Sequence, residues 1–336
     1  MAARGPADAA ADDADWLMRE LGGKHRSQVL STLAAVGVAD ALRGQRARSV
    51  DDLAAETGCD ASELESLMRA AAGLGCLAEP APGCFTLTPR GEQLCSDRLG
   101  AFAAFLGSRS QWDPWSRLRE SMRDDAPATP IERSTGRSLY EFLAEDAAAS
   151  AEYDAAIDAF TRHEAARLRG RLDLQGARSI VDVGGGRGTL LRALLAEAEA
   201  ARGVLFDLPH VVDATRASLP ASIDAVAGDF LASVPRGGDV YVLKHVLHNW
   251  PDADAQRILE NCRDARAAGG RVVVIDAVLS PDNRADLARM LDLEMRVLCG
   301  GRERRKPELR RLIRAAGMTV ESAAELSASS WLFVCR

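Results

Sequence analysis

The chain has 336 residues, of which 47% are hydrophobic and 27% are charged, and this length is enough for two folded domains. The composition excludes a disordered or fibrous protein. With 42 basic and 49 acidic residues the net charge is −7, so nothing in the overall charge attracts nucleic acid or an anionic membrane.

The N-terminal residues lack the features of a targeting segment. They are small and acidic, whereas a signal peptide needs an apolar centre, and no apolar run approaches the ~18 residues of a membrane span. We therefore expect a cytoplasmic protein that does not contact the membrane. The seven cysteines are odd in number and form no CxxC pair, which favours reduced thiols over a disulfide framework or a zinc site.

The first part of the chain predicts a tail followed by a helical domain. We expect residues 1–15 to be a disordered tail and residues 16–100 to form the first folded domain. Between Leu17 and Leu42, apolar residues recur at helical spacing. Two or three short helices are predicted there, because the pattern is interrupted by Gly22, Gly23 and Gly37.

The next segment has the outline of a winged helix-turn-helix. A helix that begins near Ser49 or Asp51 and a second helix from Asp60 precede two short strands within residues 76–87. A DNA-binding second helix would be basic, but residues 51–70 hold six acidic residues and one arginine. We therefore expect a packing or dimerisation domain that does not bind nucleic acid.

The sequence pattern changes at about residue 176. Residues 101–175 predict mainly helices, and we expect this helical linker to contribute to a substrate pocket. In residues 176–336, β-branched runs alternate with segments of helical length; these runs are SIVDV, GVLFDL, IDAVAGD, DVYVLKHV and RVVVIDAVL. Such alternation is typical of a Rossmann-like α/β fold with a doubly wound, mostly parallel sheet.

A glycine-rich loop, VDVGGGRG, ends the first of these strands at residues 181–188 and opens a helix. Its glycines, Gly184 and Gly186 among them, let the backbone turn sharply and approach a ligand that a side chain would exclude. The spacing D-x-G-x-G-x-G differs from the dinucleotide fingerprint G-x-G-x-x-G. The loop alone is weak evidence, because tight strand-to-helix turns also use glycine for steric reasons.

Acidic residues end the next two strands. Asp207 lies 19 residues beyond the loop, where an acid can accept hydrogen bonds from both ribose hydroxyls, a feature that suits a nicotinamide cofactor equally well. Asp229 stands beside Phe230 at the end of the third strand, and this pair suits an adenine, which has an exocyclic amine and a stacking face. Together the loop and the two acids favour S-adenosylmethionine (SAM) as the cofactor.

The fourth strand ends in LKHVLHNWPD, at residues 243–252, so it places Lys244, His245 and His248 at the edge where open α/β sheets bind ligands. At this point the chain resembles the SAM-dependent O-methyltransferases that act on plant phenols and bacterial aromatic natural products. The matching motifs are VDVGGGRG, LFDLPHVV, GDF, LKHVLHNWPD and GGRERR, the last followed by a helix and AAGM. The resemblance covers nearly the whole chain, and it implies a class I methyltransferase sheet and homodimerisation through an N-terminal winged-helix domain.

The resemblance also implies roles for individual residues. His248 matches the general base, and Asp276 and Glu303 match the two carboxylates that flank it. The cofactor-binding positions are expected at Gly184, Gly186, Asp207, Asp229, Phe230 and Lys244. The residues that we expect at the acceptor site are Trp112, Ile157, Phe160, Glu294 and Met295. His245 is expected to face the other side of its strand and to be structural.

The chemistry of these residue types supports the same roles. A phenol with a pKa near ~10 is a poor nucleophile while it is protonated. A neutral imidazole that takes the proton as attack begins is typically worth ~10²- to 10⁴-fold in rate. The two carboxylates would fix the imidazole tautomer and stabilise the imidazolium. We expect no metal at the site, because the sequence has no group of histidines and acids with ligand spacing.

The chain departs from the family pattern at several positions. Asn249 stands where Asp is common, and Asp276 is one methylene shorter than the Glu of many plant members, so its contact with His248 could pass through water. Glu294 and Arg296 lie on a helix that usually presents neutral or apolar residues to the acceptor, and their charges indicate a polar acceptor.

Three alternatives to O-methylation remain open at the level of sequence. A relative on the same scaffold could methylate carbon or nitrogen, or could catalyse hydroxylation or decarboxylation. A different class of protein, a winged-helix regulator with a ligand-sensing α/β domain, is opposed by the acidic second helix.

Overall fold

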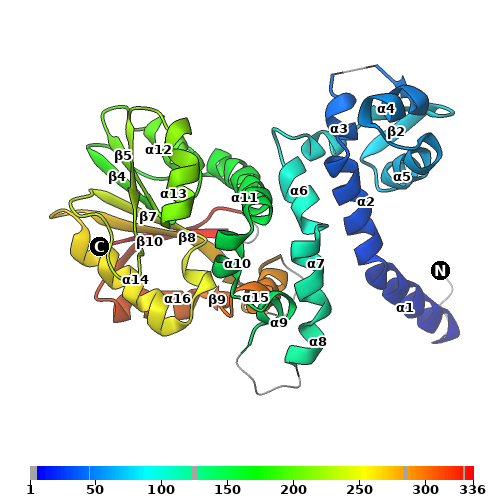
Figure 1. The fold of residues 1–336 in the computed structure, drawn as a ribbon. Coiled ribbons are helices and arrows are strands. Elements are labelled where there is room, and N and C mark those ends of the chain that lie inside the picture. The colour runs from blue at the N-terminus through cyan, green and yellow to red at the C-terminus, as the bar shows by residue number, and fades with distance from the viewer. Residues whose placement is uncertain (1–5, 45, 123–127, 283–286, 328–329) are drawn as a thin grey trace, which may run out of the picture. The chain divides into compact units, whose positions relative to one another are not determined.

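The structure, a computed structural model, describes residues 6–44, 46–122, 128–282, 287–327 and 330–336 (Figure 1). The chain divides into an N-terminal unit, Met1–Trp112, and a C-terminal unit, Asp113–Arg336. The predicted boundary after residue 100 is thus shifted to residue 112. The helices that follow residue 112 belong to the unit that contains the large sheet, whereas the sequence predicted a separate linker over residues 101–175.

Helices make up most of the N-terminal unit. Its first three helices are α1 (Pro6–Leu21), α2 (Gly23–Ala35) and α3 (Val38–Ala41), as the glycine-interrupted pattern predicts. The prediction of a disordered tail is wrong for residues 6–15, which belong to α1, while residues 1–5 lie outside the described residues. Proline at the first helical position, followed by alanines and acids, favours a helix start there.

The winged helix-turn-helix is present as predicted. Its helices are α4 (Val50–Thr57) and α5 (Ala61–Gly73), and its strands β1 (Arg48–Ser49), β2 (Leu77–Ala81) and β3 (Cys84–Leu87) pair in the order β1-β3-β2. The side chains of Ser49 and Asp60 cap the two helices by accepting backbone N–H groups. A short 3-10 turn, η1 (Gly91–Leu94), and helix α6 (Gly100–Leu106) follow.

The C-terminal unit begins with a run of helices. Helix α7 (Arg109–Ser116) crosses the division between the units, and α8 (Leu118–Ser121), α9 (Pro130–Thr135), α10 (Leu139–Glu145) and α11 (Ala147–Leu168) follow it. Capping boxes start α9 and α10, so both helix starts are determined by local sequence. Ile131, Leu139 and Leu143 of these helices are buried in one cluster with Val297 and Leu298.

The sheet of the C-terminal unit has eight strands, seven of them in the order β10-β11-β8-β7-β4-β5-β6, with β9 paired to β8. The five predicted strands pair in parallel with one another: β4 (Ser179–Val183), β5 (Arg202–Asp207), β6 (Ile223–Ala227), β7 (Val240–Lys244) and β8 (Arg271–Leu279). The short β9 (Arg304–Arg305) is also parallel to β8. An antiparallel pair that the sequence pattern does not predict, β10 (Val320–Glu325) and β11 (Ser330–Cys335), completes the sheet beside β8.

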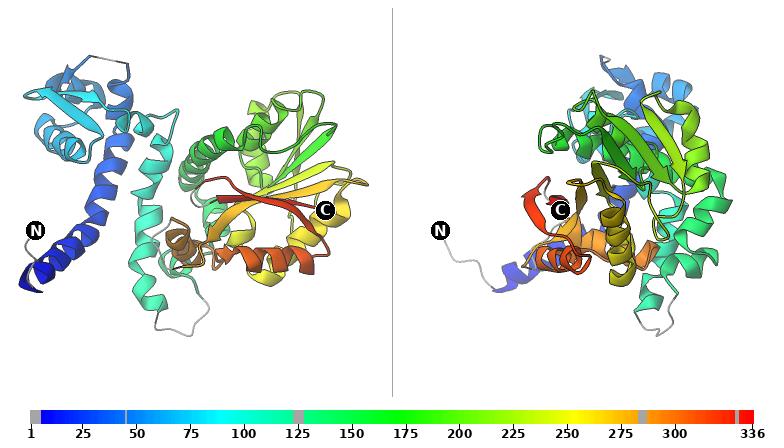
Figure 2. Two further views of the ribbon diagram at one scale, coloured as in Figure 1. Left: turned by 180° about the vertical axis from the view of Figure 1, so that it is seen from behind. Right: turned by 90° about the vertical axis from the view of Figure 1, so that its left-hand side faces the viewer.

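Helices cover both faces of this sheet (Figure 2). One face packs on α14 (Asp252–Ala265) and α16 (Lys306–Ala315), and the other on α11 and α12 (Thr189–Leu195). The remaining elements are α13 (Pro209–Thr215), α15 (Leu287–Leu298) and the 3-10 turns η2 (Arg216–Ser218) and η3 (Leu247–Asn249). The predicted doubly wound fold is confirmed. In the described part of the chain, no helix is both long enough and apolar enough to cross a membrane.

Candidate active site

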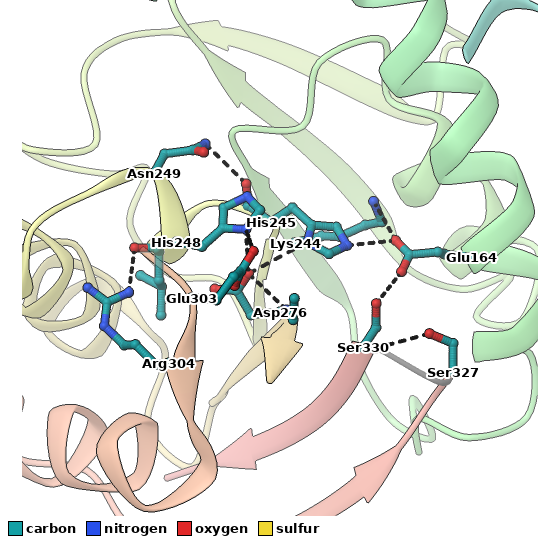
Figure 3. A network of polar contacts seen from close by, with 12 residues as sticks. Glu164, Lys244, His245, His248, Asn249, Asp276, Glu303, Arg304, Ser327 and Ser330 are labelled. Atoms are coloured by element: carbon teal, nitrogen blue, oxygen red, sulfur yellow. Dashed lines mark hydrogen bonds and ion pairs between the residues drawn. The ribbon is translucent and has the colours of Figure 1, made fainter. Parts of the chain in front are cut away.

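Two carboxylates meet one nitrogen of His248 at the carboxyl end of the parallel strands (Figure 3). His248 lies in η3, just after β7, and its Nδ1 is 2.8 Å from Oε1 of Glu303 and 3.3 Å from Oδ1 of Asp276. All three residues are buried, with exposed fractions of 7%, 1% and 3%. The structure therefore brings together the three residues that the sequence analysis singled out, and Asp276 reaches His248 directly without a bridging water.

The loop before β9, which includes Gly301, Arg302 and Glu303, packs against the backbone of the His248 turn. The backbone N–H of Arg302 donates to the carbonyl oxygen of His248 at 2.8 Å, and Gly301 packs so closely that a Cβ there would lie 2.0 Å from the same oxygen. The N–H of Glu303 donates to Oδ1 of Asp292 at 2.9 Å. These contacts aim Glu303 at the imidazole, since only glycine at position 301 allows the two backbones to approach this closely.

Arg304 also forms hydrogen bonds with the turn that carries His248. Its buried guanidinium donates to the carbonyl oxygens of Leu247 and Trp250, both at 2.8 Å, and to the carboxylate of Asp252. The planar fork of an arginine suits several acceptors in fixed directions. The turn that carries His248 is thus held by hydrogen bonds from its neighbours and not only by its own backbone.

The electrostatics of the cluster keep Asp276 ionised. Burial alone would raise the pKa of Asp276, but His248 and His245 more than offset it and the pKa is lowered. Both carboxylates face Nδ1 of His248, so the proton of the neutral ring belongs on that nitrogen. No hydrogen bond joins Nε2 to any residue that the structure describes, and this nitrogen is the one left to accept a proton.

The expectation that His245 faces away from His248 is wrong. His245 follows β7 with a φ of 53°, and this left-handed conformation breaks the strand's alternation of sides. Its ring centroid lies 5.1 Å from that of His248, and its Nδ1 lies 3.6 Å from Oδ1 of Asp276. His245 therefore belongs to the same buried cluster. The sequence predicts no grouping of metal-ligand type, but the structure has one: side-chain N and O atoms of His245, His248 and Asp276 lie within 4.8 Å of one another.

A glutamate that the sequence analysis did not single out completes this cluster. Oε2 of Glu164, on α11, lies 2.9 Å from Nε2 of His245 and 2.9 Å from Nζ of Lys244, and its Oε1 accepts from the hydroxyl of Ser330 at 2.5 Å. Lys244, an expected cofactor residue, is thus held in a buried ion pair, and it also lies over the ring of Phe160. Glu164 is 81 residues from His245 in the chain, and its helical surroundings carry no motif that signals the pairing.

The glycine loop and the next strand ends lie at the same edge of the sheet. Gly184, Gly186 and Gly188 all have positive φ, which only glycine adopts without strain. Oδ2 of Asp207 accepts the N–H of Gly186 at 2.8 Å, and Oδ1 accepts the N–H of Leu208 at 2.7 Å. Burial raises the pKa of Asp207, against these two donors. Asp229 is exposed, and Phe230 lies edge-on to Trp250 at 5.7 Å.

These residues fit an adenosyl group on the structure's own evidence. A Cβ on Gly184 would lie 3.0 Å from Val246 and 3.7 Å from Phe230, so glycine keeps that part of the loop free of a side chain. A Cβ on Gly186 would meet nothing within 4 Å, so the space beside this residue is open. The carboxylate of Asp207 has lone pairs beyond those used by its two backbone donors, as the ribose hydroxyls would require.

The expected acceptor residues fall into several places. Phe160 packs beside the ring of His245, with centroids 5.5 Å apart. On α15, Met295 is buried and Glu294 accepts a hydrogen bond from Nε1 of Trp115 at 2.6 Å. Ile157 is exposed on α11, and Trp112 belongs to the N-terminal unit, where its Nε1 donates to the carbonyl oxygen of Leu106. The charge on Glu294 is thus hydrogen-bonded within the C-terminal unit, while Arg296 is exposed and pairs with Asp292.

Aromatic residues that the sequence analysis treated as core also border the cluster. The hydroxyl of Tyr140 accepts a hydrogen bond from Nδ2 of Asn249 at 2.9 Å, and its ring stacks on Trp250. Burial raises the pKa of Tyr140 well above its ordinary value, and it does the same for Tyr153, so both hydroxyls stay neutral. Asn249, which stands where the family usually has Asp, is therefore a hydrogen-bond donor to a neutral phenol.

The close approach at Gly301 gives a test of how Glu303 is placed. We expect Gly301→Ala to push the loop away from the His248 carbonyl and to lower turnover by at least about tenfold, because small misplacements of catalytic groups are costly. Steady-state kinetics measure the loss. Gly73→Ala is the matched control, since a Cβ there meets nothing within 4 Å, and equal activity of the two variants would contradict this role of Gly301.

Comparisons with known proteins agree with both units. The O-methyltransferase domain family matches residues 115–319, and the O-methyltransferase dimerisation domain matches residues 18–97. The phenazine O-methyltransferase of Lysobacter antibioticus is 32% identical over 312 residues, 91% of each chain. The phenazine-1-carboxylate N-methyltransferase of Pseudomonas aeruginosa is 30% identical over 328 residues, 95% of this chain and 96% of the relative.

Among solved structures, a methyltransferase of calicheamicin biosynthesis with S-adenosylhomocysteine (SAH) bound has a TM-score of 0.83, 33% sequence identity and 99% coverage of both chains. This similarity spans the dimerisation and catalytic parts together. The chain belongs to the SAM-dependent O-methyltransferase family.

Proposed function

We propose that this methyltransferase transfers the methyl group of SAM to a phenolic hydroxyl of a small aromatic natural product, with His248 as the general base. The observation that carries the proposal is the pair of buried carboxylates on Nδ1 of His248, at 2.8 and 3.3 Å. They hold the Nδ1 proton and orient the ring, so Nε2 can take the proton of the acceptor hydroxyl. Methylation of nitrogen, which the N-methyltransferase relative supports as a second candidate, would make less use of such a base.

The base addresses the chemical obstacle of the reaction. A neutral phenol must lose its proton as its oxygen attacks, and an imidazole within hydrogen-bond reach contributes typically ~10²- to 10⁴-fold. Glu303 and Asp276 stabilise the imidazolium that forms. SAM, when bound, supplies a methyl group that is already activated on a sulfonium.

The cofactor is assigned to the loop and strand ends described above. We propose that Asp207 accepts the ribose hydroxyls, that the open glycine loop at Gly184 and Gly186 admits the ligand against the backbone, and that Asp229 and Phe230 recognise the adenine. Lys244 contributes to the cofactor site indirectly, because its ammonium forms an ion pair with Glu164. The acceptor side is assigned to α11 and α15 of the C-terminal unit, through Ile157, Phe160, Glu294 and Met295.

The assignment of the base predicts a large kinetic effect. We expect His248→Gln to lower turnover by ~10²-fold or more with little change in SAM affinity, because the imidazole acts on the acceptor proton alone. Turnover and calorimetric SAM binding are measured in excess chelator, where wild-type activity is expected to persist. His163→Gln is the control, since His163 lies on the exposed side of α11.

Two acceptors of different acidity separate this role from a merely steric one. If His248→Gln retains near wild-type rates on both, a pre-ionised acceptor reacts without a base, and the roles of Asp276 and Glu303 are withdrawn with that of His248. We also propose that the reaction needs no metal although His245, His248 and Asp276 lie close together, and loss of wild-type turnover in chelator would contradict this. Mass location of the methyl group on acceptors that carry both a hydroxyl and an amine decides between oxygen and nitrogen.

The ribose assignment is tested by Asp207→Ala. We expect SAM affinity to fall by about 1 to 3 kcal/mol, because ribose hydroxyls lose their acceptor in a partly dry site. Asp213→Ala, at an exposed position on α13, is expected to bind SAM as the wild type does. Unchanged affinity of the Asp207 variant, measured by isothermal titration, would show that this acid has another role.

We also propose a homodimer formed through the N-terminal unit. Helix α1 exposes large apolar side chains over its last two turns; Trp16, Leu17, Met18 and Leu21 are 50–69% exposed. A second copy of the chain would cover them, as expected for a dimerisation domain.

The expected mass in solution follows from this proposal. Light scattering at micromolar concentration should give twice the 35.9 kDa of one chain. The double substitution Leu17→Glu with Met18→Glu should shift the species toward the monomer, because it introduces charge into the apolar surface. A wild-type chain that runs only at 35.9 kDa would contradict the proposal.

A further inference from the structure

His245 adopts a backbone conformation that its residue type disfavours. Among the residues that the structure describes, it is the only residue other than glycine with a positive φ. Such conformations persist where the surroundings hold them, and they occur disproportionately at functional sites. The conformation turns the imidazole toward Asp276 and His248 instead of the opposite face of the sheet.

A buried anion on a separate helix holds this ring. Glu164 is 3% exposed, and its Oε2 contacts both Nε2 of His245 and Nζ of Lys244 at 2.9 Å, while its Oε1 accepts a hydrogen bond from the hydroxyl of Ser330 (Figure 3). Burial opposes charge on the His245 ring, but Glu164 and Asp276 more than offset burial and the repulsion of Lys244, so the pKa of His245 is raised to about 9. Burial would raise the pKa of Glu164, yet His245 and Lys244 hold it well below its ordinary value.

The position of the His245 imidazolium affects the protonation of His248. Two carboxylates on Nδ1 stabilise the protonated form of an imidazole, but a base must be neutral before it can accept a proton. The ring of His245 lies 5.1 Å from that of His248, and it shares Asp276 with it. A positive charge at this distance favours the neutral form of His248 and so opposes the effect of the carboxylates.

We propose that His245 is a positioning residue for His248. Glu164 holds the His245 ring as an imidazolium, which forms an ion pair with Asp276 at 3.6 Å and favours the neutral form of the neighbouring His248 imidazole. This inference rests on the proposed function, in which His248 is the base. His245 itself touches no reacting atom in this scheme. It acts through Asp276 and through its charge.

The charged and titratable groups around the two rings come from several elements. Asp276 lies on β8, Glu303 in the loop before β9, Glu164 on α11 and Lys244 at the end of β7. The positive charge of Arg304 on β9 helps to lower the pKa of Asp276. Tyr140 on α10 is neutral, and its hydroxyl accepts a hydrogen bond from Asn249 in the His248 turn. Without His245, the carboxylates of Asp276 and Glu303 would still contact His248, but the positive charge 5.1 Å from its ring would be lost.

The test compares His245→Gln with His163→Gln, a matched substitution at an exposed position of α11. We expect the acid limb of the pH–rate profile to move to higher pH by about one to three pH units in His245→Gln, with activity partly regained at alkaline pH. The limb should not move in His163→Gln. His245→Lys, which keeps a cation at the position, should retain the wild-type limb.

A second measurement follows His248 without relying on turnover. The chain has five histidines, so the ring carbon and proton resonances can be assigned by substitution and titrated. In His245→Gln the titration midpoint of His248 should move to higher pH. Glu164→Gln should shift it in the same direction, because His245 then loses the anion that keeps it protonated, and this variant leaves the His245 side chain in place.

The outcomes separate the inference from the proposed function. An unmoved His248 titration in both variants, or a loss of rate by the same factor at every pH, would overturn the role of His245. A moved titration with an unmoved rate profile would support the influence of His245 on His248, and it would instead contradict the assignment of His248 as the base.

Discussion

The contact between the His248 turn and the loop before β9 is the interaction on which the active site depends. His248 and Glu303 are 55 residues apart, and they meet because the Arg302 N–H binds the His248 carbonyl and Arg304 binds the carbonyls on either side of it. The parallel pairing of β9 with β8 fixes the loop relative to Asp276. A hydrogen-bonded backbone frame therefore sets the geometry of the two carboxylates and the imidazole, and Gly301 is the position where that frame has no room for a side chain.

The same site concentrates buried charge, which is stable only when it is paired. The carboxyl groups of Asp276, Glu303 and Glu164 are all buried, and their partners are Lys244, His245 and His248. The arrangement resembles a row in which anion and cation alternate from α11 to the loop before β9. A single-residue change that removes one charge leaves its neighbours unpaired, so effects on stability and on acid–base behaviour are expected to occur together.

The sequence allowed the prediction of the parallel strands, the winged helix and the residues at the strand ends, because these follow from periodicity and from motifs local in the chain. The three residues that converge on Nδ1 of His248 were predicted through a family resemblance, not through spacing. The position of His245 could not be predicted, since strand alternation assumes ordinary φ and the structure has 53° there. Glu164 and Ser330 could not be predicted either, because their contacts depend on how α11 and β11 pack against β7 and β8.

The choice of lysine at position 244 follows from the same packing. Only three of the 42 basic residues are lysines, yet position 244 holds one of them. Its ammonium is a compact charge that fits between Glu164, the Thr161 hydroxyl and the face of Phe160. A guanidinium needs a wider set of acceptors in one plane, and the second oxygen of Glu164 is already bonded to Ser330. The compact ammonium contacts Oε2 of Glu164 at 2.9 Å and leaves room for Nε2 of His245 at 2.9 Å from the same oxygen, so the lysine and the histidine share one oxygen for which an arginine would compete.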